Sequence, residues 1–312
     1  MWAENIRNIS DYLEKEIEAQ ILYLPTYRRI EQDLKALFPN VDEDNLFPEE
    51  NINDLKSHEH GYIELIQFGM EDVQKKLNLV SEVLKERART ELNSLAGSYL
   101  RDVIRGEATV YDKKVLSNLN NEDVNKMFAR VEENTLNEVD KQKLRNVIEK
   151  LKSKQIKLSE QESYLAHFFS KLVDIHHAQQ KKEEPIRQFI EICNKYLEGK
   201  RFIYDEVNYA IIMKMKDDKN IELRNLSSGE KQIVSLFSQI YLGEPKSYYV
   251  IIDEPELSLS VEWQKTLLPD IINSGRCKFL AAVTHSPFIF ANQLDSVTRD
   301  MSECISTYHG SR

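Results

Sequence analysis

Two short apolar segments near the C-terminal end constrain the fold most strongly. The segments YYVIID at 248–253 and KFLAAV at 278–283 are almost entirely apolar. One helical pattern, VEWQKTLLPDIINS, lies between them, and another, SGEKQIVSLFSQIYL, precedes the first. Apolar strands that alternate with helices of this length are typical of βαβ units, in which helices cover both faces of a parallel sheet. The sequence therefore predicts an α/β fold with a parallel sheet in this part of the chain.

The chain divides into three parts by pattern. Residues 1–116 are expected to be a mainly helical N-terminal segment with a short strand near 21–24. Residues 117–200 are rich in Glu, Lys, Gln and Asn and predict a coiled-coil-like helical insertion. These helices can pack on one another, or they can form an arm that projects from the body. Residues 201–312 are expected to form the α/β lobe.

Local sequence patterns indicate where several helices and strands begin or end. Apolar residues recur at helical spacing from 70 to 100, which predicts one long helix. Ser159 followed by Glu162 matches a capping box at the start of a helix. Pro185 suits the first turn of a further helix, because proline lacks the amide hydrogen that such a position leaves unbonded. An alternating stretch after residue 201 predicts two antiparallel strands, with the hairpin turn at 217–220.

Charge and composition exclude several classes of protein. The chain has 52 acidic and 42 basic residues, and a net charge of -10 argues against a general coat for nucleic acid while leaving room for a local basic patch. No apolar run reaches the about 18 residues that a membrane span needs. The N-terminal residues lack the basic and apolar regions of a secretory signal. Three scattered cysteines, Cys193, Cys277 and Cys304, predict neither a disulfide framework nor a zinc site. We expect a cytoplasmic protein without a membrane partner.

A pair of carboxylates ends the first apolar strand. Asp253 and Glu254 follow YYVII directly, and ligands bind at the carboxyl ends of strands in a parallel sheet. In such a pair, Asp253 can hold Mg²⁺ through water while Glu254 orients or deprotonates an attacking water. The pair alone also fits a solvated turn. The buried strand before it favours the chemical interpretation, because burial fixes where both carboxylates lie.

Two further groups flank this pair. The segment LSSGEKQ at 226–232 begins a helix, and the amide hydrogens of a Ser-Gly helix start can bind an anion. Taken alone, it also fits ordinary helix capping. Thr284, His285 and Ser286 end the second apolar strand, beside the carboxylates if the sheet is parallel. A single histidine at this place also fits a structural role.

The three groups together resemble a known family. LSSGE, YYVIIDEP and VTHSP match, in order and spacing, the signature motif, the Walker B strand and the switch histidine of ATP-binding-cassette ATPases, in particular the chromosome-maintenance and recombination-repair branch and related bacterial anti-phage ATPases. ELSLSVEWQ fills the position of the D-loop, and the resemblance covers about residues 201–292. Two earlier segments, ILYLPTYRRIE and FGMEDVQKKL, resemble Septu-type and retron-associated defence ATPases.

The resemblance implies a role for each matching residue. Asp253 would help to coordinate Mg²⁺, Glu254 would be the catalytic carboxylate, and His285 would contact the γ-phosphate of ATP. Modules of this family dimerise head to tail with two ATPs between them, so the signature acts on the ATP of the opposing module. Ser260 stands where transporter-type members carry aspartate in the D-loop, which puts transporter-like communication between the two sites in doubt. The signature residues that would contact that ATP are Ser227, Ser228, Gly229 and Glu230.

The sequence lacks one part of such an ATPase. A Walker A loop needs G-x-x-x-x-G-K-[ST], whose glycine amides wrap the phosphates and whose lysine neutralises them. The single Gly-Lys pair, Gly199-Lys200, lacks the earlier glycine and fits a helix C-cap. Three explanations follow: a second polypeptide supplies the loop, the sequence is part of a longer chain, or the ATPase is degenerate. The intact signature, carboxylates and histidine favour a half-ATPase over a degenerate one.

The sequence thus predicts a C-terminal ATPase half that hydrolyses ATP when a Walker A-bearing segment completes it. We expect it to drive a conformational change in a DNA-related or anti-phage complex that controls a nuclease or another effector. No nuclease motif is visible, because the adjacent His176 and His177 lack a metal-ligand pattern and are expected on a helix surface. The alternative is a non-hydrolytic scaffold or regulatory subunit that binds a partner ATPase through its helices.

Overall fold

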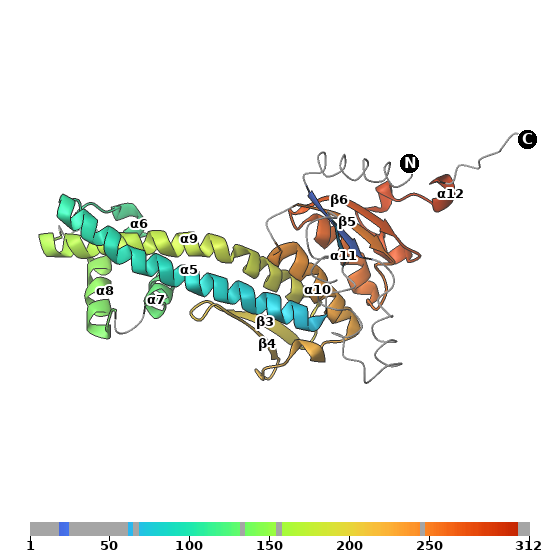
Figure 1. Cartoon of the computed structure of the whole chain (residues 1–312), viewed down its shortest axis with the longest axis horizontal. Coiled ribbons are helices and arrows are strands. Elements are labelled where there is room, and N and C mark those ends of the chain that lie inside the picture. Colours follow the sequence, from blue (N-terminus) through green and yellow to red (C-terminus); the bar gives the residue numbers. More distant parts are fainter. Residues whose placement is uncertain are drawn as a thin grey trace, which may run out of the picture. The chain divides into compact units, whose positions relative to one another are not determined.

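A computed structural model describes residues 19–24, 62–64, 69–131, 135–153, 158–243 and 247–304 of the chain. Strands and helices alternate in the C-terminal part, whereas the middle of the chain is helical (Figure 1). The elements are β1 (Ala19–Leu24), β2 (Tyr62–Glu64), α5 (Met70–Arg105), α6 (Lys113–Ser117), α7 (Asn121–Ala129), α8 (Glu138–Lys152), α9 (Glu160–Tyr196), β3 (Lys200–Asp205), β4 (Ala210–Met215), η2 (Leu223–Asn225), α10 (Ser228–Leu242), β5 (Ser247–Asp253), α11 (Val261–Ile272), β6 (Cys277–Val283), η3 (Pro287–Ile289), η4 (Asp295–Val297) and α12 (Met301–Cys304).

The described residues fall into two compact units. The first unit contains β1, β2, residues 195–197 at the end of α9, and the chain from residue 222 onward. The second contains most of α5 and α9, the short helices α6 to α8, and the hairpin of β3 and β4. The hairpin was expected within the lobe at 201–312, and it groups instead with the helices.

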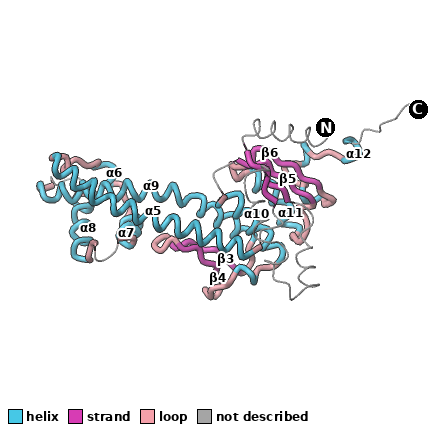
Figure 2. The backbone as a smooth tube through the Cα atoms, viewed as in Figure 1, coloured by secondary structure: helices cyan, strands magenta, loops and turns pink. Residues whose placement is uncertain are grey.

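The first unit is built on a parallel sheet with the strand order β2-β1-β5-β6. Every neighbouring pair in this sheet is parallel, as the two apolar segments predict. β1 covers the short strand expected near 21–24 and pairs with β5 along its whole length. The sheet and the β3-β4 hairpin are the magenta strands in Figure 2. The mixed α/β class and the parallel sheet are therefore confirmed.

Helix α10 covers one face of the sheet. Tyr248, Val250 and Ile252 of β5 are almost fully buried, and the Tyr248 hydroxyl donates a 3.1 Å hydrogen bond to the carbonyl of Gln239 in α10. Alternate residues of a strand lie on the same face, so these three mark the core side of the sheet. The apolar residues predicted for the buried side of α10 are all buried, namely Ile233, Leu236, Phe237, Ile240 and Tyr241.

The second unit has its own core between two long helices and three short ones. α5 and α9 lie side by side (Figure 1), and Glu91 of α5 accepts hydrogen bonds from Gln179 and Lys182 of α9. Of the two arrangements that the sequence left open, the helices of this unit pack on one another around a shared hydrophobic cluster. Its buried members are Leu95, Leu116, Leu119, Val124, Met127, Phe128, Val131, Leu144, Val147, Ile148, Leu151, Ala166, Phe169, Leu172 and Val173.

A buried ion-pair network ties the hairpin to α9 within the second unit. Glu183 is fully buried and accepts hydrogen bonds from Arg130 at 2.8 Å and from Arg187 at 2.7 Å. Arg130 and Arg187 also bond to Glu206, which lies in the turn between β3 and β4. Burial raises the pKa of Glu183, whereas the charge of Arg130 opposes this shift. Movement of the hairpin turn would break the bonds of Arg130 and Arg187 to Glu206. A buried charge that loses its partner is strongly destabilising, so the network holds the turn in place.

Two predictions are wrong: the start of a helix at Pro185 and the position of the hairpin turn. Pro185 does not begin a helix but lies inside the single helix α9. A proline there removes one backbone hydrogen bond, and the full burial of Glu183, Ile186 and Phe189 around it offsets this cost. The main hairpin turn lies at 206–209, where the Asp205 carboxylate accepts the amide hydrogens of the turn, and the expected turn at 217–220 closes only an isolated bridge.

The two adjacent histidines also differ from the expectation. His177 is exposed, but His176 is buried, although both were expected on the helix surface. Burial, aided by the charge of Arg130, lowers the pKa of His176 to about 4, so the ring is neutral at pH 7. His176 therefore belongs to the packed interior of the second unit.

Candidate functional site

The predicted acidic pair and the predicted histidine meet at the carboxyl edge of the sheet. Asp253 is the last residue of β5 and pairs in register with Val283, the last residue of β6. The amide of Glu254 then donates a 2.8 Å hydrogen bond to the carbonyl of Val283. His285 follows two residues later and is exposed. The sheet thus brings Asp253, Glu254 and His285 to one edge, where parallel sheets bind ligands.

Glu254 has a strained backbone. Its φ is 49°, which is uncommon for a residue with a side chain and costs of order 1–3 kcal/mol. The hydrogen bond to Val283 and the buried ring of Pro255 hold this conformation in place. Strained residues of this kind cluster at functional sites. The conformation therefore supports a functional role for Glu254.

Glu256 holds the loop that carries His285. The sequence does not indicate this role of Glu256. One carboxylate oxygen of Glu256 accepts a 2.6 Å hydrogen bond from the Thr284 hydroxyl, and the other accepts a 2.9 Å bond from the amide of His285. Hydrogen bonds to an ionised carboxylate are about twice as strong as neutral ones. Glu256 therefore fixes the position of the His285 backbone relative to the end of β5.

Gln264 of α11 makes a second connection between the same loops. Its side-chain oxygen accepts a 2.6 Å hydrogen bond from the Ser286 hydroxyl, and its side-chain nitrogen donates a 3.0 Å bond to the carbonyl of Leu259. The loop after β5 and the loop after β6 are thus joined by Glu256 and Gln264. Neither residue gave a sequence signal, because the bonds that join the two loops connect residues 22 to 29 positions apart along the chain.

The predicted signature residues lie at the start of α10. Ser227 caps the helix, and it forms a capping box with Glu230: the Glu230 amide donates to the Ser227 hydroxyl, and the Ser227 amide donates to the Glu230 carboxylate at 2.7 Å. Gly229 and Glu230 are buried, whereas Ser227 and Ser228 are exposed. Ser228 therefore lies at the surface of the helix start, whereas Gly229 and Glu230 are packed inside it.

Gly229 permits a close approach of two loops. A Cβ atom at this position would lie 2.3 Å from the carbonyl oxygen of Ser258 and 3.3 Å from the Trp263 ring. Ser258 itself has a φ of 62°, so its backbone lies in the left-handed region. The start of α10 therefore packs directly against the loop that follows the acidic pair, and only glycine fits there.

Ser260 has a structural role in this chain. Its side chain caps α11 by accepting a 3.3 Å hydrogen bond from the amide of Trp263. The residue is exposed at the end of the loop. The structure thus explains a serine at this position through helix capping, and its contact with nucleotide stays a prediction.

The residues at the edge fit one mode of Mg²⁺ binding. The described residues contain no group of three or more His, Cys, Asp or Glu side chains that could form a metal cage. Mg²⁺ in phosphate-transfer sites keeps several waters and uses only one or two carboxylates together with phosphate oxygens. Asp253, which is half-buried at the end of β5, has the donor chemistry for this mode.

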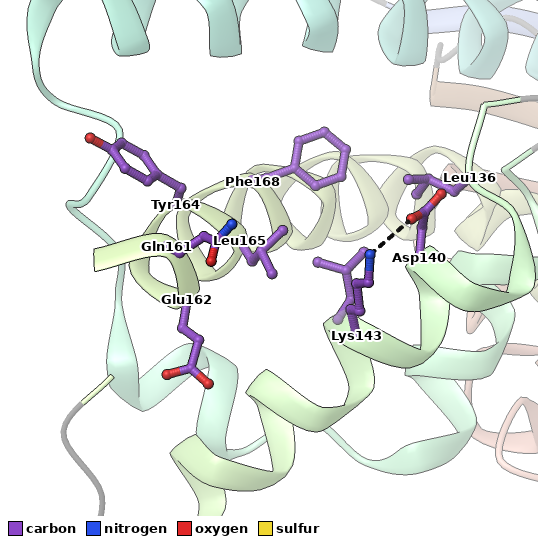
Figure 3. A pocket seen from close by; sticks show the side chains of 9 residues that line it. Leu136, Asp140, Lys143, Gln161, Glu162, Tyr164, Leu165 and Phe168 are labelled. Atoms are coloured by element: carbon purple, nitrogen blue, oxygen red, sulfur yellow. Dashed lines mark ion pairs between the residues drawn. The ribbon is translucent and has the colours of Figure 1, made fainter. Parts of the chain in front are cut away.

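A cavity of about 480 Å³ lies in the second unit, between α8 and the start of α9 (Figure 3). Its walls include Leu165 and Phe168, and an ion pair at 3.9 Å joins Lys143 to Asp140. None of the predicted site residues lines it.

No helix in the described part of the chain is both long and apolar enough to cross a membrane.

Comparison with known families decides the class of the protein. The model of a family described as "AAA domain, putative AbiEii toxin, Type IV TA system" matches residues 22–291, which include most of the sheet and all of the motif residues. The chain belongs to this family. Membership places it among AAA-type ATPase domains, a class that binds ATP together with Mg²⁺. No curated protein matches the sequence.

Similar solved structures include heads of SMC proteins. One is an SMC head bound to the C-winged helix domain of ScpA, 21% identical with a TM-score of 0.28, covering 38% of this chain and 40% of that chain. A second, from Pyrococcus furiosus, has an extended coiled coil bound to the C-terminal domain of ScpA; it is 17% identical with a TM-score of 0.30, covering 86% and 56%. A third, from Pyrococcus yayanosii, has a coiled coil and joint; it is 17% identical with a TM-score of 0.28, covering 90% and 65%. The chain thus spans 40% to 65% of their lengths.

Proposed function

We propose that this chain is the C-terminal half of an ATP-binding-cassette-type ATPase, with residues 117–200 as its helical insertion. A segment that carries a Walker A loop would complete the site, and we call this assembly the completed ATPase. The observation that carries the proposal is the meeting of Asp253, Glu254 and the His285 loop at one edge of a parallel sheet. Membership in an AAA family supports it.

The residues at the edge suit hydrolysis of ATP. Glu254 would orient a water molecule for attack on the γ-phosphorus and accept its proton, as the bond between the β,γ-bridging oxygen and the γ-phosphorus breaks. His285 would contact the γ-phosphate, held in place by the bonds from its loop to Glu256. Asp253 would hold Mg²⁺ through water, and the ion would neutralise phosphate charge when bound.

The start of α10 suits contact with the ATP of a second ATPase module. Ser228 is exposed at the amino end of a helix of 15 residues, where the amide hydrogens and the helix dipole favour an anion. Ser227 and Glu230 are occupied by the capping box, so within this group Ser228 would make the main side-chain contact. We propose a head-to-tail dimer of modules, with Ser260 near the opposing site.

The output of ATP hydrolysis would be a change in the helical region that controls an effector. The sequence resemblance supports a role in anti-phage defence or in a DNA-related complex, with a nuclease as one such effector. The net charge of -10 means that any DNA contact would use a local patch or a partner protein. A non-hydrolytic scaffold makes the opposite prediction, because its nucleotide-site residues would be dispensable.

The proposal is tested by Asp253→Asn in the completed ATPase. The change removes a charged acceptor for Mg²⁺-bound water, and charge-assisted hydrogen bonds are worth about 1.5–3 kcal/mol, so we expect the affinity for ATP in excess Mg²⁺ to fall about 10- to 100-fold. Equilibrium titration with a fluorescent ATP analogue measures this affinity. Asp174→Asn, at an exposed position of α9, is the matched control. Unchanged affinity in Asp253→Asn would favour the scaffold.

Glu256 is expected to act as a positioning residue. In Glu256→Ala, Thr284 and the His285 amide lose their carboxylate partner, and we expect the kcat of ATP hydrolysis to fall about 10- to 100-fold while KM changes little. Steady-state phosphate release by the completed ATPase separates the two constants. Glu82→Ala, an exposed glutamate of α5, should leave both unchanged. A rise in KM at constant kcat would contradict the positioning role.

A further inference from the structure

Aliphatic side chains gather on the exposed side of the last turns of α5, in the second unit. Leu100 is 59% exposed and Ile104 is 79% exposed, and Val103 between them is exposed as well. Spacings of three and four residues place all three on one face of the helix. Val110, in the loop that follows α5, is 70% exposed. We call these four residues the α5 patch.

The backbone that carries the α5 patch is held firmly. Asp102 faces α9 from the same turns of α5, and its carboxylate pairs with Lys171 at 2.7 Å. The ring of His167 bridges this carboxylate, at 2.9 Å, and the carbonyl of Val110. The bridge keeps the loop beside the end of α5, so the patch is one preformed surface. Contiguous exposed apolar side chains of this kind mark a site of interaction.

The charges around the α5 patch are mainly basic. Four exposed basic side chains lie in residues 100–114, although the whole chain has a net charge of -10. They are Arg101, Arg105, Lys113 and Lys114. Of the two exposed acids in this stretch, Asp112 already accepts backbone amides at the start of α6, which leaves Glu107. Among the described residues, no carboxylate pairs with Arg101 or Arg105. The patch therefore complements an acidic partner.

This combination of apolar and basic groups decides between occupants. A second copy docked through the same patch would place Arg101 and Arg105 against the same arginines, and like charges oppose association. Binding to the backbone of duplex DNA uses charge and hydrogen bonds, so it would leave the aliphatic side chains without a partner. Helices that bind a membrane surface have their main apolar face free, whereas that of α5 is buried in the second unit. An acidic protein segment satisfies both parts of the patch.

We propose that the α5 patch docks an amphipathic helix of a partner protein, with acidic side chains along its flanks. The apolar residues of that helix, spaced i, i+3, i+4 and i+7, would pack on Leu100 and Ile104. Its carboxylates would face Arg101 and Arg105, which adds specificity and speeds association. The inference concerns the second unit and does not depend on the proposed ATPase activity.

Two designed peptides test the chemistry of the occupant. Both are fluorescein-labelled helices of about 18 residues with leucine at i, i+3, i+4 and i+7, and their flanks carry glutamate in one and lysine in the other. In fluorescence anisotropy, we expect the full chain to bind the glutamate peptide at least about tenfold more tightly than the lysine peptide, with a smaller difference at high salt. Equal affinity for the two peptides would overturn the proposal.

A substitution in the patch tests the apolar contact. Ile104→Ser should weaken binding of the glutamate peptide about tenfold or more, because it removes an apolar anchor. Leu79→Ser makes the same kind of change at an exposed position of α5 outside the patch and should leave the affinity unchanged. Both side chains are largely exposed, so circular dichroism should show an unchanged fold. Equal affinities of the two variants for this peptide would contradict the proposed site.

Reversal of the charges tests the flanks. Arg101→Glu combined with Arg105→Glu should make the lysine peptide the tighter ligand. Arg87→Glu combined with Arg89→Glu changes the net charge of the chain by the same amount at exposed positions of α5, and it should keep the original order of the two peptides. The same order in both double variants would show that the arginines of the patch do not select the partner.

Other occupants are measured with probes of their own. These are a duplex DNA of mixed sequence, vesicles that contain phosphatidylserine, and the chain itself in analytical ultracentrifugation. Binding to DNA or to vesicles that is tighter than binding to the glutamate peptide, and that Ile104→Ser abolishes, would overturn the proposal. A dimer of the chain that Ile104→Ser dissociates would overturn it as well.

Discussion

Glu254→Gln in the completed ATPase is expected to lower the rate of ATP hydrolysis by about two to four orders of magnitude, the range that a general base contributes. Glutamine has the size of glutamate and can still hydrogen-bond to water, but it cannot accept a proton. The loss should fall on kcat, because Glu254 would act on the attacking water and not on the bound nucleotide. ATP binding should therefore persist.

Single-turnover hydrolysis of radiolabelled ATP, together with equilibrium binding of a fluorescent analogue, separates these two effects. Glu82→Gln makes the same chemical change at an exposed position of α5, where the side chain pairs with Lys85 at 4.0 Å. This control should hydrolyse ATP at the original rate. A Glu254→Gln protein that keeps its full rate would exclude Glu254 as the base.

The backbone of Glu254 makes this substitution informative. Its positive φ is held by the bond to Val283 and by the strand before it, and neither depends on the side-chain carboxylate. Glutamine can adopt the same strained conformation at the same cost, so the fold should not change. A difference in rate then reports on the carboxylate itself.

Local patterns predicted the elements that carry the site. The apolar run before Asp253 forms β5, and the periodic apolar residues after Ser227 form the buried side of α10. Both could be predicted because the burial of a strand or of a helix face requires apolar residues at a regular spacing within one short segment. The capping box of Ser159 and Glu162 formed for the same reason, since both of its hydrogen bonds join residues three apart.

Contacts between distant segments could not be predicted in this way. Glu256 bonds to Thr284, which is 28 residues away, and no spacing rule connects them. By local preference Pro185 was expected in the first turn of a separate helix, yet the packing of Ile186 and Phe189 kept α9 continuous. In each case tertiary packing decides the outcome, and a single sequence does not state which segments will pack together.

The approach of α10 to the loop after β5 leads to the second large prediction. Gly229→Ala is expected to destabilise the protein by about 3 kcal/mol or more, because the new Cβ would lie 2.3 Å from the Ser258 carbonyl oxygen. The clashing atom belongs to the backbone, so it cannot rotate away as a side chain would. Helix propensity alone predicts the opposite sign, since alanine is favoured over glycine by about 1 kcal/mol within a helix.

Gly97→Ala is the matched control because it isolates the helix propensity. Gly97 lies in α5, and a Cβ there would meet no atom within 4 Å. This variant should gain up to about 1 kcal/mol in the free energy of unfolding, measured by urea denaturation. Opposite signs at the two glycines would show that the close approach to Ser258, and not the helix, requires glycine at 229. If Gly229→Ala is as stable as Gly97→Ala, α10 does not pack against Ser258, and the signature residues are not fixed relative to the loop after the acidic pair.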